Sequence, residues 1–138
     1  MNVNDSLVYL VARTNRQLEQ SLAQMIRNDG VTIEVMRILD AVTESAGMAM
    51  GPLALRVLVD APTLTKIIDR MVSDGLVYRT PDLGDRRRVI VVATDKGQAL
   101  QQKLQSITAD KEELLVQALG GNEARRLKQL LKVLLELD

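Results

Sequence analysis

Hydrophobic residues recur every three or four positions through most of the chain, which is the spacing of amphipathic helices. The first such stretch covers residues 7–26, with Asp5 or Ser6 as its N-cap. It is predicted to end at Asn28-Asp29-Gly30, because this run favours a turn. Thr32 is predicted to cap a second helix, whose apolar positions follow one another at helical spacing.

Two more helices are predicted before the middle of the chain. Pro52 suits the first turn of a short third helix. Asp60 is a strong N-cap for a fourth helix, which tolerates Pro62 in its first turn and ends at Gly75. The fourth helix is predicted to bury Leu64, Ile67, Ile68, Met71 and Val72.

The pattern changes after Gly75. Two strand-like runs, residues 76–79 and 89–93, flank a turn rich in Pro, Asp and Gly, and together they predict a β-hairpin. Arg86, Arg87 and Arg88 stand side by side where the turn leads into the second strand. A cationic tip on a small sheet suits a nucleic-acid backbone or groove, and a solvated loop is the alternative interpretation.

Two helices are predicted after the hairpin. Thr94 caps a long fifth helix, Gly120-Gly121 ends it, and Asn122 opens the last one. A short helix, a tight turn, a second helix and a basic hairpin together make a winged helix-turn-helix. The predicted fold class is therefore mainly α with a small β-hairpin wing. The fifth helix is expected to turn Leu100, Leu104, Ile107, Leu114 and Ala118 inward, and the last helix bears Leu127, Leu130, Leu131, Leu134 and Leu135.

Composition narrows the chemistry. The chain has no Cys and no His, which excludes thiol nucleophiles, histidine bases and the usual zinc sites, so no metal or other cofactor is predicted. An enzyme would have to use carboxylate pairs such as Glu112-Glu113, but adjacent acids on a helix point apart. The net charge is zero, so nucleic-acid binding must rest on local clusters of cations. No stretch is apolar enough to span a membrane and the N-terminus lacks a signal peptide's pattern, so a cytoplasmic protein is expected.

Residues 32–97 resemble the winged-helix core of the MarR family of bacterial transcriptional regulators. Asp69-Arg70-Met71 followed by Gly75-Leu76-Val77 is similar to the family's recognition-helix pattern, and Asp85-Arg86-Arg87 before Thr94-Asp95-Lys96-Gly97 is similar to its wing signature. The two motifs occur in the family's order and at its separation. Leu58 departs from the family, since a glycine is common at that turn.

The resemblance implies a DNA interface on the fourth helix and the wing. Thr63 and Thr65 can hydrogen-bond to base edges or place a methyl group against thymine, while Lys66 can reach a guanine or a phosphate. Arg87 matches the arginine that enters the minor groove, Arg86 and Arg88 are candidate phosphate contacts, Asp85 would pin Arg87 by a bidentate pair, and Asp69 would orient the wing. The predicted DNA-binding residues are Pro62, Thr63, Thr65, Lys66, Arg70, Arg86, Arg87 and Arg88.

The resemblance also implies how the chain is organised. Residues 1–138 form a single MarR-like domain, in which residues 31–97 bind DNA and residues 1–30 and 98–138 supply dimerisation helices. The expected function is a sequence-specific repressor that acts as a homodimer on a palindromic operator. A small anionic or aromatic effector that releases the DNA is a further implication, with Arg13 and Arg16 as candidate ligands for it. The alternative is a winged helix that docks proteins and does not bind DNA.

Overall fold

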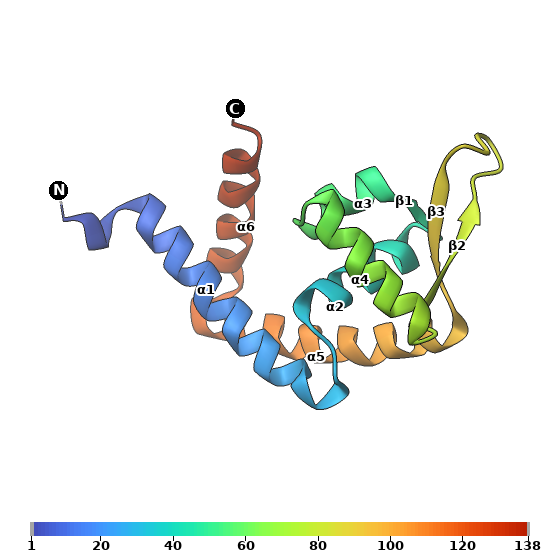
Figure 1. Ribbon diagram of the computed structural model, residues 1–138. Helices are drawn as coiled ribbons and strands as arrows, with labels where there is room; N and C mark the ends of the chain where they lie inside the picture. The colour runs from blue at the N-terminus through green and yellow to red at the C-terminus, as the bar shows by residue number, and fades with distance from the viewer. Residues whose placement is uncertain (1, 138) are drawn as a thin grey trace. The chain divides into compact units, whose positions relative to one another are not determined.

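The computed structural model describes residues 2–137 and divides the chain into two compact units, residues 1–105 and 106–138. It confirms the predicted fold class, because the described residues form six α-helices and one small three-stranded antiparallel sheet (Figure 1). The α-helices are α1 (Leu7–Ile26), α2 (Ile33–Glu44), α3 (Met50–Val57), α4 (Ala61–Ser73), α5 (Asp95–Leu119) and α6 (Gly121–Leu135), and two short 3-10 turns lie at Val3–Asp5 and Arg27–Asp29. None of the helices among the described residues is both long enough and apolar enough to cross a membrane.

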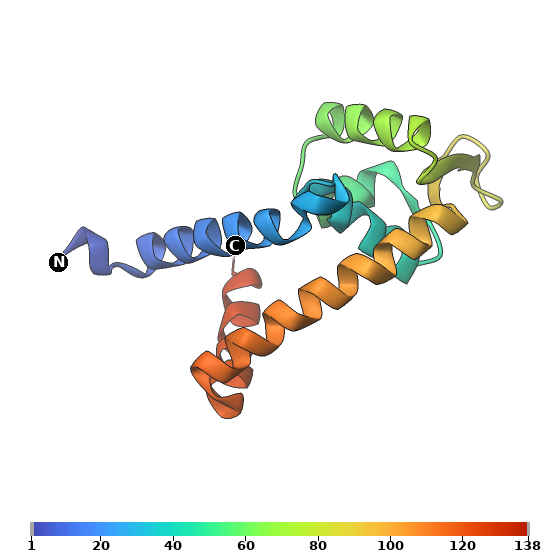
Figure 2. The ribbon, with the colours of Figure 1, turned by 90° about the horizontal axis from the view of Figure 1, so that it is seen from below.

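The sheet has one strand more than the sequence predicts. Strands β2 (Val77–Pro81) and β3 (Val89–Ala93) form the expected hairpin, with Val77 opposite Ala93. The extra strand, β1 (Met48–Ala49), pairs antiparallel with β3, so the strand order is β1-β3-β2. Figure 2 shows α4 leading through a short turn into β2, so that α4 and the hairpin are consecutive elements.

The predicted N-caps are confirmed. The side-chain oxygens of Ser6, Thr32 and Asp60 accept hydrogen bonds from backbone N–H groups in the first turns of α1, α2 and α4, and Ser6 takes the cap that the sequence leaves open between it and Asp5. Thr94 caps α5 by accepting from the Gly97 N–H at 3.0 Å. The sixth helix begins one residue earlier than predicted, at Gly121, and Gly120 is its cap.

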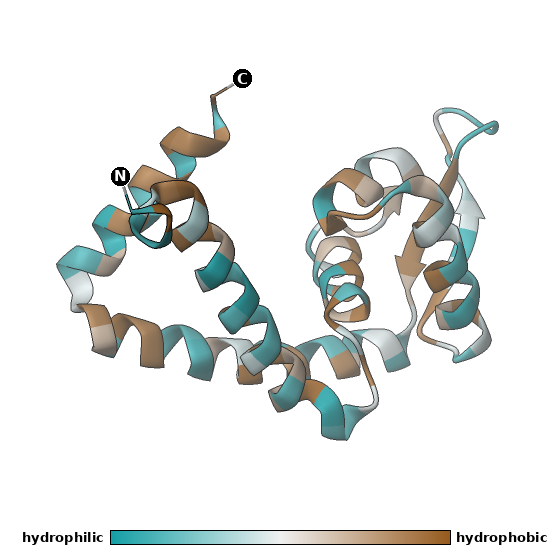
Figure 3. Ribbon diagram, turned by 60° about the vertical axis from the view of Figure 1, so that its left-hand side comes forward, coloured by the Kyte–Doolittle hydropathy of each residue, from teal (hydrophilic) through white to brown (hydrophobic). Residues whose placement is uncertain are grey.

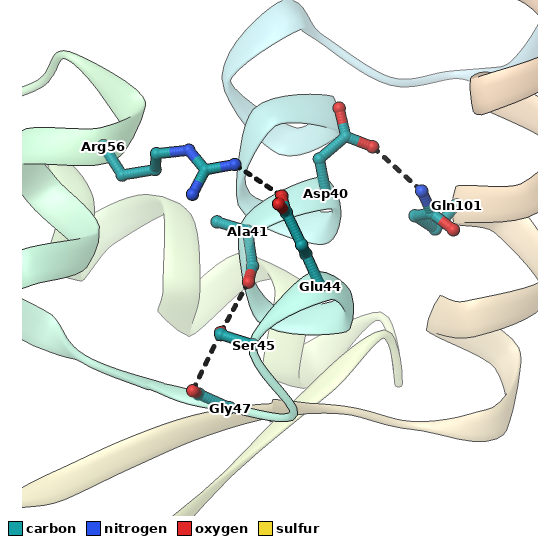
Figure 4. Close-up of polar contacts among 7 residues, drawn as sticks. All are labelled: Asp40, Ala41, Glu44, Ser45, Gly47, Arg56 and Gln101. Carbon is teal, nitrogen blue, oxygen red and sulfur yellow. Dashed lines mark hydrogen bonds and ion pairs between the residues drawn. The ribbon is translucent and has the colours of Figure 1, made fainter.

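The core lies in residues 1–105, where α2 is the central helix. Ile38, Leu39 and Val42 of α2 are buried together with residues of α3, α4 and β3. Polar contacts hold the same helix from two sides (Figure 4). The Gln101 amide of α5 donates to the Asp40 carboxylate at 3.1 Å, and the Arg56 guanidinium of α3 donates to Glu44 at 2.6 Å. The first helix of the helix-turn-helix and the first turns of α5 are therefore both fixed on α2.

The turn between α3 and α4 places a leucine in a conformation that favours glycine. Leu58 ends α3 with φ 69° and ψ 39°, in the left-handed region, and 75% of its surface is exposed. An L-residue pays roughly 1–2 kcal/mol in this region because its Cβ crowds the backbone. Leu58 therefore forms, at this cost, a turn in which a glycine would not be strained.

We expect Leu58→Gly to raise the free energy of unfolding by roughly 0.5–1 kcal/mol, since the relief of backbone strain exceeds the extra entropy of an unfolded glycine. Chemical denaturation measures this difference. Leu55→Gly is the matched control, because Leu55 is 81% exposed in α3 and helical, so there the same substitution should destabilise by about 1 kcal/mol. Equal destabilisation by both variants would contradict the strain at Leu58.

Residues 106–137 contain little that is buried. Ala124 is the one buried residue of this stretch, and an ion pair of 2.9 Å joins Lys128 of α6 to Glu112 of α5. The prediction that Leu114 and Ala118 turn inward is wrong for this chain alone, because both are exposed. Figure 3 shows hydrophobic residues on successive turns of α6. The exposed leucines of this unit are Leu114, Leu119, Leu127, Leu130, Leu131, Leu134, Leu135 and Leu137.

Candidate nucleic-acid interface

Helix α4 turns one face to the core and the opposite face to solvent. Leu64, Ile68 and Met71 are fully or almost fully buried, as predicted, and Ile67 is half-buried. Val72 is the exception to the predicted core, because 37% of its surface is exposed. The residues predicted to contact DNA on this helix are all on the exposed face, namely Pro62, Thr63, Thr65, Lys66 and Arg70.

The start of α4 is ordered by its own side chains. Asp60 accepts from the Thr63 N–H at 2.7 Å. Hydrogen bonding from the Thr63 side chain, together with this backbone bond and the nearby Lys66 ammonium, holds the pKa of Asp60 below its usual value. The Thr65 hydroxyl donates back to the Ala61 carbonyl at 3.1 Å. These bonds fix the first turns of α4 without using the Lys66 ammonium as a donor.

An ion pair joins the recognition helix to the wing. Arg79 of β2 donates to Asp69 of α4 at 2.6 Å, and the Arg79 side chain is only 34% exposed. Arg70 lies 3.6 Å from Asp74 and stays 82% exposed, so its guanidinium remains available to a ligand. The structure thus places Asp69 where it can orient the wing. The sequence alone does not identify Arg79 as its partner, although Arg79 stands at the basic position that follows Gly75-Leu76-Val77 in the motif similar to the family's.

The wing arginines lie in the loop that joins β2 to β3. Arg86, Arg87 and Arg88 are all exposed and precede the first residue of β3, so the alternation of a strand does not govern their directions. Asp85 accepts from the Arg87 backbone N–H at 3.1 Å, and its carboxylate lies 3.5 Å from the Arg87 Nε. This is a single long contact, not the bidentate pair that was predicted. The Arg87 side chain is 93% exposed because Asp85 holds mainly its backbone.

An open cleft of about 810 Å³ lies beside the exposed face of α4. Lys66 and Arg70 line it from α4, and Lys96 lines it from the first turn of α5. Arg13 and Arg16, the effector ligands suggested by the sequence, are exposed on α1 and are not among the residues that line this cleft. Lys96 was missed, although it belongs to the Thr94-Asp95-Lys96-Gly97 motif. Within residues 2–137, no cluster of three or more acidic side chains could hold a metal ion.

Comparison with known proteins gives a consistent picture. The chain matches the MarR family over residues 29–88. It is 30% identical over 104 residues to the homoprotocatechuate degradative operon repressor of Escherichia coli, an alignment that covers 75% of this chain and 70% of that protein.

Solved structures share the fold over nearly the whole chain. The MarR family transcriptional regulator SPO1453 from Silicibacter pomeroyi superposes with a TM-score of 0.87 at 31% identity, covering 99% of this chain and 97% of that chain. A mutant of MarR from Escherichia coli, complexed with operator DNA, superposes with a TM-score of 0.84 at 28% identity, covering 94% and 93%. These relatives are regulators of transcription, not enzymes.

Proposed function

Because the chain belongs to the MarR family of transcriptional regulators, we propose that it represses transcription as a homodimer bound to a palindromic operator. The observation that carries this proposal is the link between the two elements predicted to contact DNA. The exposed face of α4 and the arginine-bearing wing are held together by the pair Asp69–Arg79. A helix of this kind enters the major groove, and cations on an adjoining loop reach the backbone or the minor groove.

The exposed leucines support a homodimer. One winged helix reads too few base pairs for specificity, and symmetric pairing would place two reading heads about 34–36 Å apart, one helical turn of DNA. In α6, Leu127, Leu131 and Leu134 recur at helical spacing and are 40–48% exposed. On α1, Leu10 and Val11 are 41% and 46% exposed. A soluble monomer rarely leaves an apolar helix face such as that of α6 in water. We therefore assign residues 1–30 and 98–138 to the dimer interface.

The cleft beside α4 supports binding of a small anionic effector. Lys66, Arg70 and Lys96 supply three cations around it against the two carboxylates of Asp29 and Asp74, and two of the cations lie on α4. An anion in the cleft would compete with DNA for Lys66 and Arg70, so its binding and DNA binding would oppose each other. These cations therefore support an effector site beside α4, away from Arg13 and Arg16.

Two measurements test the proposed function. Sedimentation at micromolar concentration should give a dimer. In a titration with duplex DNA, the logarithm of the binding constant should fall with the logarithm of the salt concentration, with a slope of about 0.9 per phosphate neutralised. Arg86→Ala should reduce the slope by roughly one unit per subunit if Arg86 contacts a phosphate. A monomer would contradict the homodimer. A folded dimer that binds no duplex at low salt would instead favour a protein-docking module.

A further inference from the structure

The exposed face of α4 consists of two stripes with different chemistry. Residues three and four apart are neighbours on a helix surface. Thr63, Lys66 and Arg70 follow this spacing, and the last two line the cleft, so these residues form the cleft-side stripe. Pro62, Thr65 and Asp69 also follow it, and Asp69 pairs with Arg79 of the wing, so these residues form the wing-side stripe.

The wing-side stripe has no free hydrogen-bond donor of its own. Proline has no N–H, and the Asp69 carboxylate only accepts. The Thr65 hydroxyl already donates its hydrogen bond to the Ala61 carbonyl, at 3.1 Å. Thr65 therefore offers its methyl group and an acceptor lone pair to the groove. The cleft-side stripe, in contrast, carries the ammonium of Lys66 and the guanidinium of Arg70.

This difference selects between base pairs. Guanine presents two acceptors in the major groove, and against a donor-free stripe both would lose their hydrogen bonds. An A·T pair presents the thymine methyl group, which apolar groups can cover, and the adenine amino group, which an acceptor can bind. Pro62 and the Thr65 methyl supply the apolar surface, while the Thr65 oxygen and Asp69 supply acceptors.

We propose that Thr65, with Pro62 beside it, recognises the 5-methyl group of a thymine in each half of the operator. Thr65 is thus a specificity-determining residue, and Lys66 reads a neighbouring position or a phosphate. The inference rests on the proposed function, because it requires α4 to lie in the major groove.

The test begins with an operator selected from a random duplex pool by the full-length protein. Each thymine is then replaced by deoxyuridine, which removes only the methyl group. At one position in each half-site, affinity should fall about fourfold, the effect of exposing one buried methyl group. Thr65→Ser keeps the hydroxyl and loses the methyl, so it should abolish this sensitivity. Thr65→Val keeps a methyl in the same shape and should retain it.

The outcomes distinguish the role of Thr65 from the proposed function on which it rests. Sensitivity to deoxyuridine that persists unchanged in Thr65→Ser would overturn the role of Thr65, as would tight operator binding with no sensitive position. Failure of the unchanged protein to bind any duplex would overturn the proposed function and this inference together. Circular dichroism checks that both variants fold, which is expected because Thr65 is exposed.

Discussion

Replacing Arg87 with alanine is expected to weaken binding to duplex DNA by about tenfold for each wing, and so by about a hundredfold for a dimer that uses both. The reason is the position of Arg87, whose side chain is 93% exposed at the turn of the wing while Asp85 holds its backbone. A hydrogen bond to a charged group contributes about 1.5 kcal/mol, which corresponds to a factor of ten. The loss should be similar for most sequences, with a residual preference at A·T-rich flanks whose minor groove is narrow.

The measurement is the affinity of Arg87→Ala for the selected operator and for unrelated duplexes at one salt concentration. Arg56→Ala is the matched control, because it removes the same charge from an exposed position on α3, outside the proposed DNA contacts and the proposed dimer interface. Thr63→Ala and Lys66→Ala complete the comparison, since they should relax preference at particular base pairs instead of weakening all sequences alike. If Arg87→Ala binds as tightly as Arg56→Ala while folding is intact, the wing does not enter the groove.

Gly97→Ala should lower the free energy of unfolding by about 3 kcal/mol, although alanine is the better helix former. A Cβ atom at Gly97 would clash with the Leu76 carbonyl oxygen. That oxygen belongs to the backbone and also accepts from the Thr94 N–H at 3.0 Å, so it cannot move aside as a side chain would. The first turn of α5 would have to shift away from the start of β2.

Chemical denaturation of Gly97→Ala and Gly51→Ala tests this expectation. Gly51 lies in α3, and a Cβ there meets no atom within 4 Å, so its substitution should be neutral or stabilise by up to about 1 kcal/mol. The two glycines are therefore expected to respond in opposite directions. A stabilised Gly97→Ala would mean that the close approach of α5 to Leu76 is absent in solution.

Local signals explain why the helices could be predicted from the sequence. Ser6, Thr32 and Asp60 bond to N–H groups three residues ahead, so the cap and its partner lie within one turn. The hairpin is local for the same reason. Strand β1 could not be predicted in this way, because its two residues become a strand only by pairing with β3 some forty positions later.

The candidate site was less predictable than the fold. Its residue types follow from the motifs, but their partners depend on how elements pack. The side chains of Asp69 and Arg79 meet because α4 ends beside β2. Arg87 lacks its predicted bidentate partner because the loop turns its side chain outward. Leu114 and Ala118 fit a buried helical stripe, yet helical spacing alone does not specify whether the covering surface lies in the same chain.

Because residues 106–137 have almost no core, the resistance of the protein to degradation depends on its concentration. With the homodimer proposed above, the leucines of α6 gain their cover only when two chains meet, so the ordered fraction follows the total concentration of chains. Single chains at low concentration would expose these helices to proteases. New copies would then persist only once enough of them are made, and the rate of synthesis would set a threshold below which the regulator is cleared before it can reach its operator.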